Sequence, residues 1–214
     1  MNSHFFAYIA RMRLIRRWSL MQNNSPENIQ EHSHRTAILA HALATIRKVV
    51  YKKPVNAERV AFLALLHDAG EVITGDLPTP VKYFDPAIRK AYRAIEDAAN
   101  LRLLEFLPPE FRAEYEPALL PAVADAENWE LVRAADKLCA WLKCVEERRG
   151  GNREFLLAEE ALWRQLNGLA LEEVAYFLER FAPGFSLTLD ELGSPLPTPG
   201  AGTGDMANAV ENSL

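Results

Sequence analysis

Residues 60–71, VAFLALLHDAGE, place a histidine and an aspartate at the end of a nearly unbroken apolar run. Such a run favours a helix that is buried on most sides, so the pair His67-Asp68 would lie at the edge of the core. An imidazole beside a carboxylate is costly to bury unless the two are hydrogen-bonded, paired or coordinated to a cation. The stretch therefore predicts either a metal site or a His-Asp hydrogen bond that closes a core helix, and for two residues alone the second outcome is more common.

The composition is that of an ordinary globular protein, with 49% hydrophobic and 25% charged residues in a chain of 214. One domain is the default for this length. The formal net charge of -5 provides no basic surface for polymeric nucleic acid, and no apolar stretch is long enough to span a membrane. The start of the chain also lacks a signal-peptide core and cleavage site. We therefore expect a cytoplasmic protein that binds neither polymeric nucleic acid nor a membrane.

The two cysteines, Cys139 and Cys144, lie five residues apart on one expected helix and point to different faces of it. This arrangement offers neither a disulfide framework nor a zinc site built from cysteines. It suits a reducing compartment.

Apolar residues recur with a period near 3.6 along most of the chain, whereas strand patterns are scarce. The pattern predicts an all-α fold of about seven or eight helices, in one domain over residues 1–192. Residues 193–214 contain too few apolar side chains to pack, and we expect them to form a disordered tail.

Caps and prolines set the expected boundaries of the helices. Pro117 and Pro121 are expected to break the chain into short pieces, and residues 74–80 to form an ordered loop, since they contain Gly and two Pro. The expected helices are an amphipathic one within residues 5–18 with Phe6, Ile9 and Met12 at helical spacing, one from a capping box over residues 28–31 to Val50, one from Asn56 or Ala57 to the His67-Asp68 pair, and three more over residues 87–106, 130–149 and 155–181.

Four metal-competent side chains stand on otherwise apolar helices or helix ends: His32, His67, Asp68 and Asp136. Two imidazoles and two carboxylates suit a divalent first-row metal better than Ca²⁺ or Mg²⁺, because hard cations prefer oxygen ligands only. With room for water, such a site would keep open positions for chemistry.

The order His, then His-Asp, then Asp on successive helices resembles the HD superfamily of metal-dependent phosphohydrolases. The resemblance is to the bacterial 5'-deoxynucleotidases of that superfamily, and it runs over about residues 3–191. It implies an HD-domain helical bundle that hydrolyses deoxyribonucleoside 5'-monophosphates to deoxyribonucleosides and phosphate. The segments that carry it are SHFF (3–6), RRW (16–18), EHS (31–33), HDAGE (67–71), TGDLPTPVK (74–82) and ADKL (135–138).

The same resemblance implies roles for individual residues and a homodimer. Arg17 and Trp18 would contact the nucleotide, with Arg17 orienting the phosphate. At position 70 the family more often has Ser, so Gly70 would loosen the turn before Glu71. One divalent metal, Co²⁺ as the family's characteristic activator or else Mn²⁺, Zn²⁺ or another first-row ion, would be held by His32, His67, Asp68 and Asp136, while Asp76, Leu77, Pro78 and Thr79 would line the sugar pocket.

The residue types suit phosphate ester hydrolysis by a water that a metal activates. Glu71 follows Asp68 by three residues, so a continuing helix would place both on one side, where Glu71 could accept or relay a proton. The guanidinium of Arg17 can bind phosphate in a bidentate manner. Asp76 could accept a hydrogen bond from a sugar hydroxyl, and crowding of a 2'-oxygen by its loop would favour deoxyribose.

Each of these residues also has a structural explanation. Glu71 could be a solvated helix-end glutamate, Arg17 a surface arginine, Trp18 a core anchor and Asp76 part of a turn. Among the other polar residues, we expect a surface position for His4 and solvated side chains for Lys82 and Lys137. His34 and His41 are expected to be structural or solvent-facing.

Two other functions remain open from the sequence. One is an HD-domain hydrolase of another small phosphoester, and the other is a non-catalytic nucleotide-binding regulatory module. The ligands, the proton relay and the arginine occur together, which favours a deoxynucleotidase. A second His and Asp cluster for a binuclear site is not evident, which argues mildly against cyclic diesterases.

Overall fold

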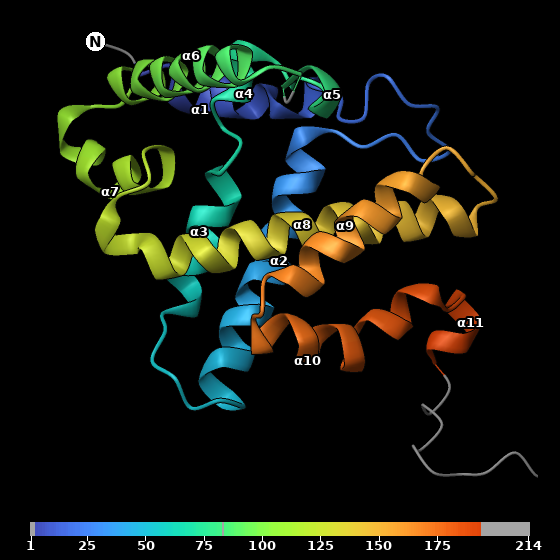
Figure 1. The fold of residues 1–214 in the computed structure, drawn as a ribbon. Coiled ribbons are helices and arrows are strands. Elements are labelled where there is room, and N and C mark those ends of the chain that lie inside the picture. Colours follow the sequence, from blue (N-terminus) through green and yellow to red (C-terminus); the bar gives the residue numbers. More distant parts are fainter. Residues whose placement is uncertain (1–2, 83, 194–214) are drawn as a thin grey trace, which may run out of the picture.

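Helices make up the regular structure of the described residues, 3–82 and 84–193 of a computed structural model (Figure 1). Seven α-helices in this part have nine residues or more, which confirms the all-α prediction and its expected number of helices. In chain order the elements are α1 (Phe5–Ile9), η1 (Ala10–Leu14), α2 (Ile29–Val49), α3 (Ala57–Leu66), α4 (Glu71–Thr74), α5 (Thr79–Lys82), α6 (Pro86–Glu105), α7 (Pro109–Leu119), η2 (Val123–Asp125), α8 (Ala126–Arg149), α9 (Leu156–Gly168), α10 (Glu172–Arg180), η3 (Ala182–Ser186) and α11 (Leu189–Leu192), where η marks a 3₁₀ helix.

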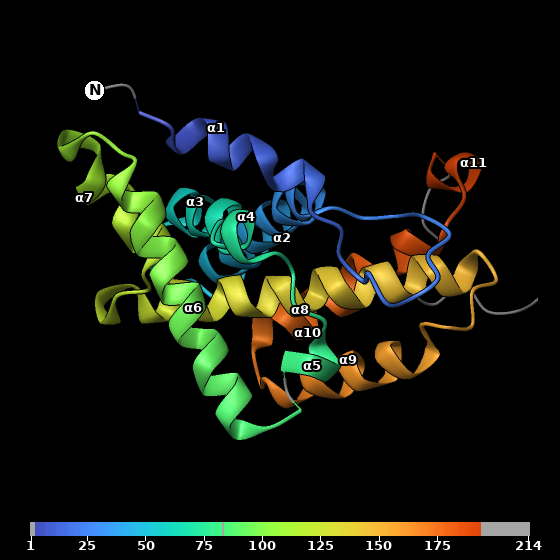
Figure 2. The same cartoon turned by 90° about the horizontal axis from the view of Figure 1, so that it is seen from above.

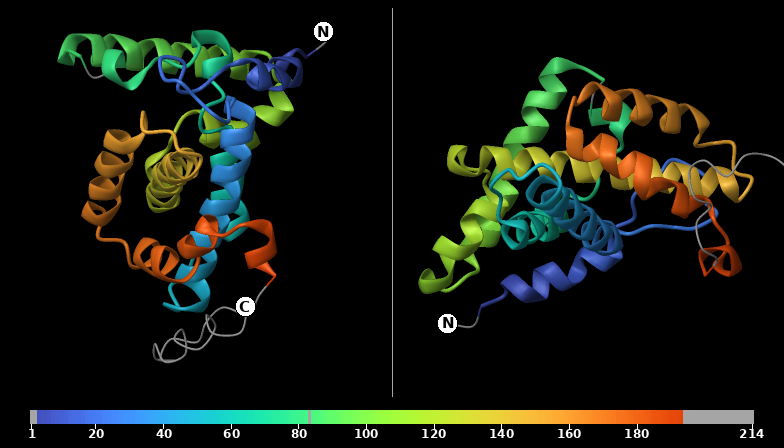
Figure 3. Two further views of the ribbon diagram at one scale, coloured as in Figure 1. Left: turned by 90° about the vertical axis from the view of Figure 1, so that its right-hand side faces the viewer. Right: turned by 90° about the horizontal axis from the view of Figure 1, so that it is seen from below.

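Helix α8 runs across the middle of the molecule, and α2 and α3 cross it (Figure 1). Seen nearly end-on, α8 lies between α2 and α9 (Figure 3, left). From above, α1, α4 and α6 cover one end of α2 and α3 (Figure 2). The apolar side chains that fill the crossing of α2, α3 and α8 include Leu43, Leu63, Leu131, Leu138 and Leu142, all fully buried.

Local capping explains where the two site-bearing helices begin. Asn28 Oδ1 accepts a hydrogen bond from Glu31 N at 3.0 Å, and Glu31 Oε2 accepts one from Asn28 N at 3.3 Å, which is the predicted capping box. Asn56 caps α3 through Arg59 N at 2.8 Å. Both predicted starts are therefore confirmed, and α3 ends with His67 as its C-cap.

Two predicted boundaries around prolines are wrong. Pro117 lies inside α7 and does not break the chain there. It falls in the last turn, so its missing N–H removes only one helical hydrogen bond, and the helix ends two residues later. The predicted loop over residues 74–80 shrinks to residues 75–78, since Thr74 ends α4 and Pro80 occupies the first turn of α5, a position that tolerates proline.

Three other helices differ from expectation. The predicted helix over residues 155–181 is divided into α9 and α10 at Ala170, which has a left-handed φ of 52°. Helix α8 begins four residues earlier than predicted, at Ala126. The first helix is short and continues as η1, so its buried side chains are Phe5 and Met12 while Phe6 is exposed.

The predicted disordered tail, residues 193–214, lies outside the described residues except for Gly193. Within the described part, no helix combines the length and apolar content needed to cross a membrane. Both cysteines are free and buried.

Core packing at the α2–α3 crossing predicts unequal effects of two leucine substitutions in α3. Leu63→Ala should lower the free energy of unfolding by about 3 kcal/mol, because Leu63 is fully buried. Leu65→Ala, at a side chain that is 44% exposed, should lower it by less than about 1 kcal/mol. Urea unfolding of both variants measures this difference, and equal losses would contradict the packing described.

Candidate active site

Three helices bring the four predicted metal ligands together. His32 lies in the first turns of α2, His67 and Asp68 in the turn after α3, and Asp136 within α8. His32 Nε2 is 3.1 Å from Asp136 Oδ1 and 3.6 Å from Asp68 Oδ2. His67 Nε2 is 3.2 Å from Asp68 Oδ2 and 4.0 Å from Asp136 Oδ1. Both imidazoles thus present the same ring nitrogen to the same pair of carboxylates.

The second nitrogen of His67 explains which tautomer faces the carboxylates. Nδ1 of His67 donates to the carbonyl oxygen of Ala64 at 2.7 Å, so the lone pair of the neutral ring is on Nε2. That Nε2 is buried and makes no hydrogen bond of good geometry. A histidine whose Nδ1–H is held by a backbone carbonyl is the usual arrangement of a metal ligand.

Charges in the cluster favour a cation between the carboxylates. Burial and the positive charge of Arg17 lower the pKa of His32. Burial also acts to lower the pKa of His67, but the negative charges of Asp68 and Asp136 outweigh burial and raise this pKa to about 9. Burial alone would raise the pKa values of the two carboxyl groups, yet the imidazoles hold both well below their usual range.

The donor set therefore fits a divalent metal. Ligand atoms of His32, His67 and Asp68 lie within 4.8 Å of one another, and Asp136 borders this group. Two imidazoles, which lose any proton on Nε2 when a metal binds there, and two anionic carboxylates would suit a divalent first-row ion.

Glu71 is the first residue of α4, directly after the His-Asp turn, and its N–H donates to the carbonyl oxygen of Asp68 at 3.0 Å. Its Oε2 is buried without a hydrogen-bond partner among the described residues. Burial, and then the negative charges of Asp68 and Asp76, raise the pKa of Glu71 far above its usual range. The burial of Oε2 argues against the solvated helix-end alternative, and the raised pKa favours the protonated form of the carboxyl group.

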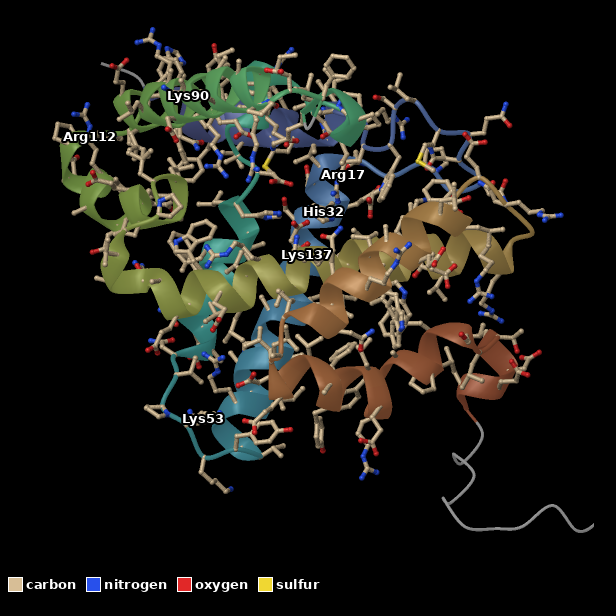
Figure 4. All side chains as sticks on the ribbon, viewed as in Figure 1. Arg17, His32, Lys53, Lys90, Arg112 and Lys137 are labelled. Atoms are coloured by element: carbon tan, nitrogen blue, oxygen red, sulfur yellow. The ribbon has the colours of Figure 1, made fainter. Side chains whose placement is uncertain are left out.

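Arg17 points into the same cluster. Its NH2 group is 4.0 Å from Asp136 Oδ1 and its NH1 group is 3.4 Å from Glu27 Oε2. Its backbone N–H donates to the carbonyl oxygen of Glu27 at 3.0 Å, next to the bridge that pairs Arg16 with Asn28. Figure 4 shows the side chains of Arg17 and His32 beside each other at one end of α2. With a side chain only 15% exposed, Arg17 is not a surface arginine.

Trp18 has features of both a core anchor and a residue that could contact the nucleotide. Its ring packs edge-on against Phe155, with centroids 5.3 Å apart, so it does anchor its segment. Its backbone has a left-handed φ of 55°, a conformation that a bulky residue adopts only under constraint. The indole Nε1 is buried and has no hydrogen-bond partner among the described residues.

The predicted sugar loop lies between α4 and α5. Gly75 has a φ of 74°, which favours glycine, and its carbonyl oxygen accepts hydrogen bonds from Tyr92 and from Thr74 at 3.2 and 2.9 Å. Of the predicted pocket residues, Asp76, Leu77 and Pro78 are half-buried and Thr79 is exposed. Burial raises the pKa of Asp76, and it interacts electrostatically with Arg17, Asp68 and Lys82.

The expectation that Lys82 is solvated is wrong. Its Nζ lies 2.7 Å from Glu96 Oε1 and 4.9 Å from the centroid of the Tyr92 ring. These contacts tie α5 to α6. The three remaining histidines, His4, His34 and His41, are exposed as expected.

Sequence reasoning missed two buried neighbours of His32, namely Glu27 and Cys139. Burial raises the pKa of the Cys139 thiol to about 12, so the thiol stays protonated and is a poor ligand. Glu27 instead pairs with Arg17 and, at 3.9 Å, with Arg35. No local motif marks Glu27, since it precedes α2 and its partners are recognisable only in three dimensions.

Comparisons with known proteins agree with this geometry. A family model described as 5'-deoxynucleotidase YfbR-like matches residues 4–185. The chain is 52% identical to a 5'-deoxynucleotidase of Vibrio cholerae serotype O1 over 191 residues, which covers 89% of this chain and 98% of that protein. It is 48% identical to the 5'-deoxynucleotidase YfbR of Escherichia coli over 196 residues, covering 92% and 98% of the two chains.

Solved structures share the fold at lower sequence identity. An HD-domain phosphohydrolase from Listeria innocua superposes with a TM-score of 0.73 at 20% identity, covering 85% of this chain and 88% of that one. A cyanophage S-2L HD phosphohydrolase bound to dA and one catalytic Zn²⁺ ion gives 0.59 at 24% identity, covering 83% and 95%. The predicted HD-domain fold is therefore confirmed.

Gly70 needs its small size rather than glycine's backbone freedom. Its φ is −57°, and the turn around it is closed by hydrogen bonds from Glu71 N to Asp68 O and from Ile73 N to Gly70 O, both 3.0 Å long. A Cβ at position 70 would lie 2.6 Å from Asn100 Oδ1, which is buried without a partner. The predicted loosening of the turn by Gly70 stays a prediction.

This close approach predicts coupling between positions 70 and 100. Gly70→Ala should lower the free energy of unfolding by less than about 1 kcal/mol, because the end of the Asn100 side chain can shift, and adding Asn100→Ala should remove this loss. Urea unfolding of the two single variants and the double variant measures the coupling. Strictly additive losses would show that Asn100 does not limit the size of residue 70.

Proposed function

The chain belongs to the 5'-deoxynucleotidase YfbR-like family and is a metal-dependent 5'-deoxynucleotidase, and we propose that His32, His67, Asp68 and Asp136 form its reaction centre. The observation that carries this assignment is the convergence of both Nε2 atoms on the two carboxylates, within 3.1–4.0 Å. The substrate is a deoxyribonucleoside 5'-monophosphate, and the products are the deoxyribonucleoside and phosphate.

We propose that these four residues hold one divalent metal, with Co²⁺ as the preferred activator and Mn²⁺ or Zn²⁺ as alternatives. The single catalytic Zn²⁺ in the cyanophage HD phosphohydrolase supports a mononuclear site. When bound, the metal would polarise a phosphate oxygen and lower the pKa of a water.

The neighbouring side chains supply the remaining chemistry. Arg17, held between Glu27 and Asp136, binds and orients the phosphate through its guanidinium group. Glu71, whose carboxyl group is kept protonated by burial and by Asp68, donates a proton to the 5'-oxygen as its bond to phosphorus breaks. A proton on the 5'-oxygen means that this oxygen leaves as a hydroxyl group and does not have to carry the negative charge of an alkoxide.

Nucleotide binding is assigned to two segments. Trp18 offers the unpaired Nε1 and the face of its indole. The loop from α4 to α5, with Asp76, Leu77, Pro78 and Thr79, contacts the sugar and disfavours a 2'-hydroxyl by crowding it.

We also propose the cellular form of the enzyme. The catalytic domain comprises residues 1–192 and works in the cytoplasm, as its two free cysteines suit a reducing compartment. It acts on small nucleotides rather than on polymeric nucleic acid or at a membrane. It assembles as a homodimer, and the exposed side chains of Leu156 and Trp163, seven residues apart on one face of α9, offer an apolar surface for this. Sedimentation equilibrium distinguishes the dimer from a monomer.

The metal assignment predicts that activity is lost with the metal and regained with its replacement. Metal-stripped protein should release phosphate from deoxyribonucleoside 5'-monophosphates only after metal is added, most with Co²⁺ among Co²⁺, Mn²⁺, Zn²⁺ and Mg²⁺, and faster than from ribonucleotides. His32→Ala should lower the rate by at least about a hundredfold. His34→Ala, an exposed histidine on the same helix, is the matched control and should keep full activity.

Two outcomes would contradict this assignment. One is the absence of phosphate release from every deoxynucleotide with all four metals. The other is equal activity of His32→Ala and His34→Ala.

The proton-donor role of Glu71 makes a separate prediction. Glu71→Gln keeps the size of the side chain but removes its acidic proton, so kcat should fall by about 10²–10⁴-fold while metal affinity stays within about twofold. Glu58→Gln on the exposed face of α3 is the control. Steady-state kinetics and calorimetric titration of Co²⁺ measure the two quantities. An unchanged kcat in Glu71→Gln would remove Glu71 from the reaction.

A further inference from the structure

A buried ion pair on α8 lies outside the site described above. Lys143 and Glu147 are each 2% exposed and form an ion pair one helical turn apart. The Glu147 carboxylate also accepts hydrogen bonds from the backbone N–H groups of Asn24 at 2.9 Å and Ser25 at 3.0 Å, and Lys143 Nζ donates to the carbonyl oxygen of Ser25. Hydrogen bonds from Lys143 and from these two amides outweigh burial and lower the pKa of Glu147 to about 2. The pair therefore binds the backbone of the segment between η1 and α2.

Further contacts hold this segment to the end of α8. Asn152 Nδ2 donates both to the carbonyl oxygen of Gln22 at 2.7 Å and to Glu147 Oε2 at 2.8 Å. Asn24 Nδ2 donates to the carbonyl oxygen of Gly150 at 3.0 Å. Figure 2 shows the segment between α1 and α2 running beside this end of α8.

The anchored segment determines the backbone of Trp18. The carbonyl oxygen of Trp18 accepts hydrogen bonds from Met21 N at 3.0 Å and from Asn23 Nδ2 at 3.2 Å. Asn23 directly precedes Asn24, whose amide binds Glu147. A left-handed φ at a tryptophan persists only when surrounding contacts over-determine it, and these contacts do so.

The same pair also reaches the indole ring of Trp18. Lys143 Nζ lies 5.5 Å from the ring centroid of Phe155, which is fully buried. Phe155 in turn packs edge-on against Trp18. Thus the ring of Trp18 is connected to the Lys143–Glu147 pair through Phe155, and its backbone is connected to the pair through Asn23 and Asn24.

We propose that Lys143 and Glu147 are positioning residues that hold Trp18 in the conformation that receives the nucleotide. Neither residue touches the substrate or the metal ligands. Asp136, Lys143 and Glu147 are separated by seven and four residues, so they lie along one face of α8. One rigid helix thereby sets the distance between the metal centre and the nucleotide-binding tryptophan. This inference rests on the proposed contact of Trp18 with the nucleotide.

Replacement of Glu147 tests the proposal. In the full-length protein with Co²⁺, Glu147→Gln should raise KM for 2'-deoxyadenosine 5'-monophosphate by about tenfold and leave kcat within about threefold. Co²⁺ affinity should not change, and amide hydrogen exchange at residues 22–26 should accelerate. In a Trp18→Ala background, Glu147→Gln should produce no further rise in KM, because the tryptophan that Glu147 positions is then absent.

A matched control separates positioning from general loss of stability. Glu173 is also a buried carboxylate, 1% exposed, and its Oε1 lies 2.6 Å from Arg47 Nε in an ion pair between α10 and α2. Glu173→Gln should destabilise the protein without changing KM. If Glu147→Gln does not fold, Asn152→Ala removes two of the contacts described above while leaving the ion pair, and it should also raise KM.

The proposal is overturned if hydrogen exchange accelerates while KM stays constant, because the pair is then structural only. It is also overturned if Glu173→Gln raises KM as much as Glu147→Gln does. A third contrary result is that Glu147→Gln raises KM by the same factor in the Trp18→Ala background as in the wild-type protein. A wild-type protein that releases no phosphate from any deoxynucleotide contradicts the proposed function instead. In that case the Kd for 2'-deoxyadenosine 5'-monophosphate, measured by calorimetry, replaces KM in the same comparison.

Discussion

Charge balance at the junction of α2, α3 and α8 is the constraint on which the rest of the structure depends. Two carboxylates and two imidazoles meet at the end of an apolar core, where an uncompensated charge is expensive. Arg17 faces Asp136 on one side and Glu27 on the other, and Glu27 is also near Arg35. A divalent cation held by the four proposed ligands would complete this balance, so the proposed metal site and Arg17 belong to one electrostatic unit.

The same concentration of negative charge explains the chemistry available to Glu71. Burial is the largest cause of its raised pKa, and the negative charges of Asp68 and Asp76 raise it further. A carboxylic acid that keeps its proton at neutral pH can serve as a general acid, whereas an exposed glutamate could not. The short turn from His67 to Glu71 therefore places the proposed ligand pair His67-Asp68 and the proposed proton donor Glu71 within one helical turn, and Gly70 in that turn lies close to the side chain of Asn100 on α6.

Helix α8 connects the proposed metal ligands with the segment that carries Trp18. Asp136 faces the two histidines, and the buried pair Lys143–Glu147 further along the helix binds the backbone of residues 24–25. Buried ion pairs contribute little net stability when they replace apolar packing, but they specify geometry when their hydrogen bonds are satisfied. In this protein the geometry specified is that of Trp18, whose left-handed backbone would otherwise relax.

The sequence by itself determined the helical fold, the starts of α2 and α3 and the four candidate ligands. These features are local: periodicity reports which face of a helix is buried, caps report where it begins, and His32 or Asp136 stands out because its neighbours are apolar. The resemblance to the HD superfamily then grouped the ligands before any distance was known. Helix ends near Pro117 and Ala170 escaped prediction because local propensity there is overridden by the surrounding packing.

Only the tertiary structure decided which buried polar groups pair with one another. Glu147 with Asn24, Glu173 with Arg47 and Lys82 with Glu96 are contacts between different elements, and no spacing rule along the chain identifies them. A residue's own neighbours report whether it is buried, but the partner that makes burial of a charge tolerable depends on how whole helices cross. For that reason the ligands of this protein could be recognised in the sequence, whereas the groups that position its arginine, its glutamate and its tryptophan could not.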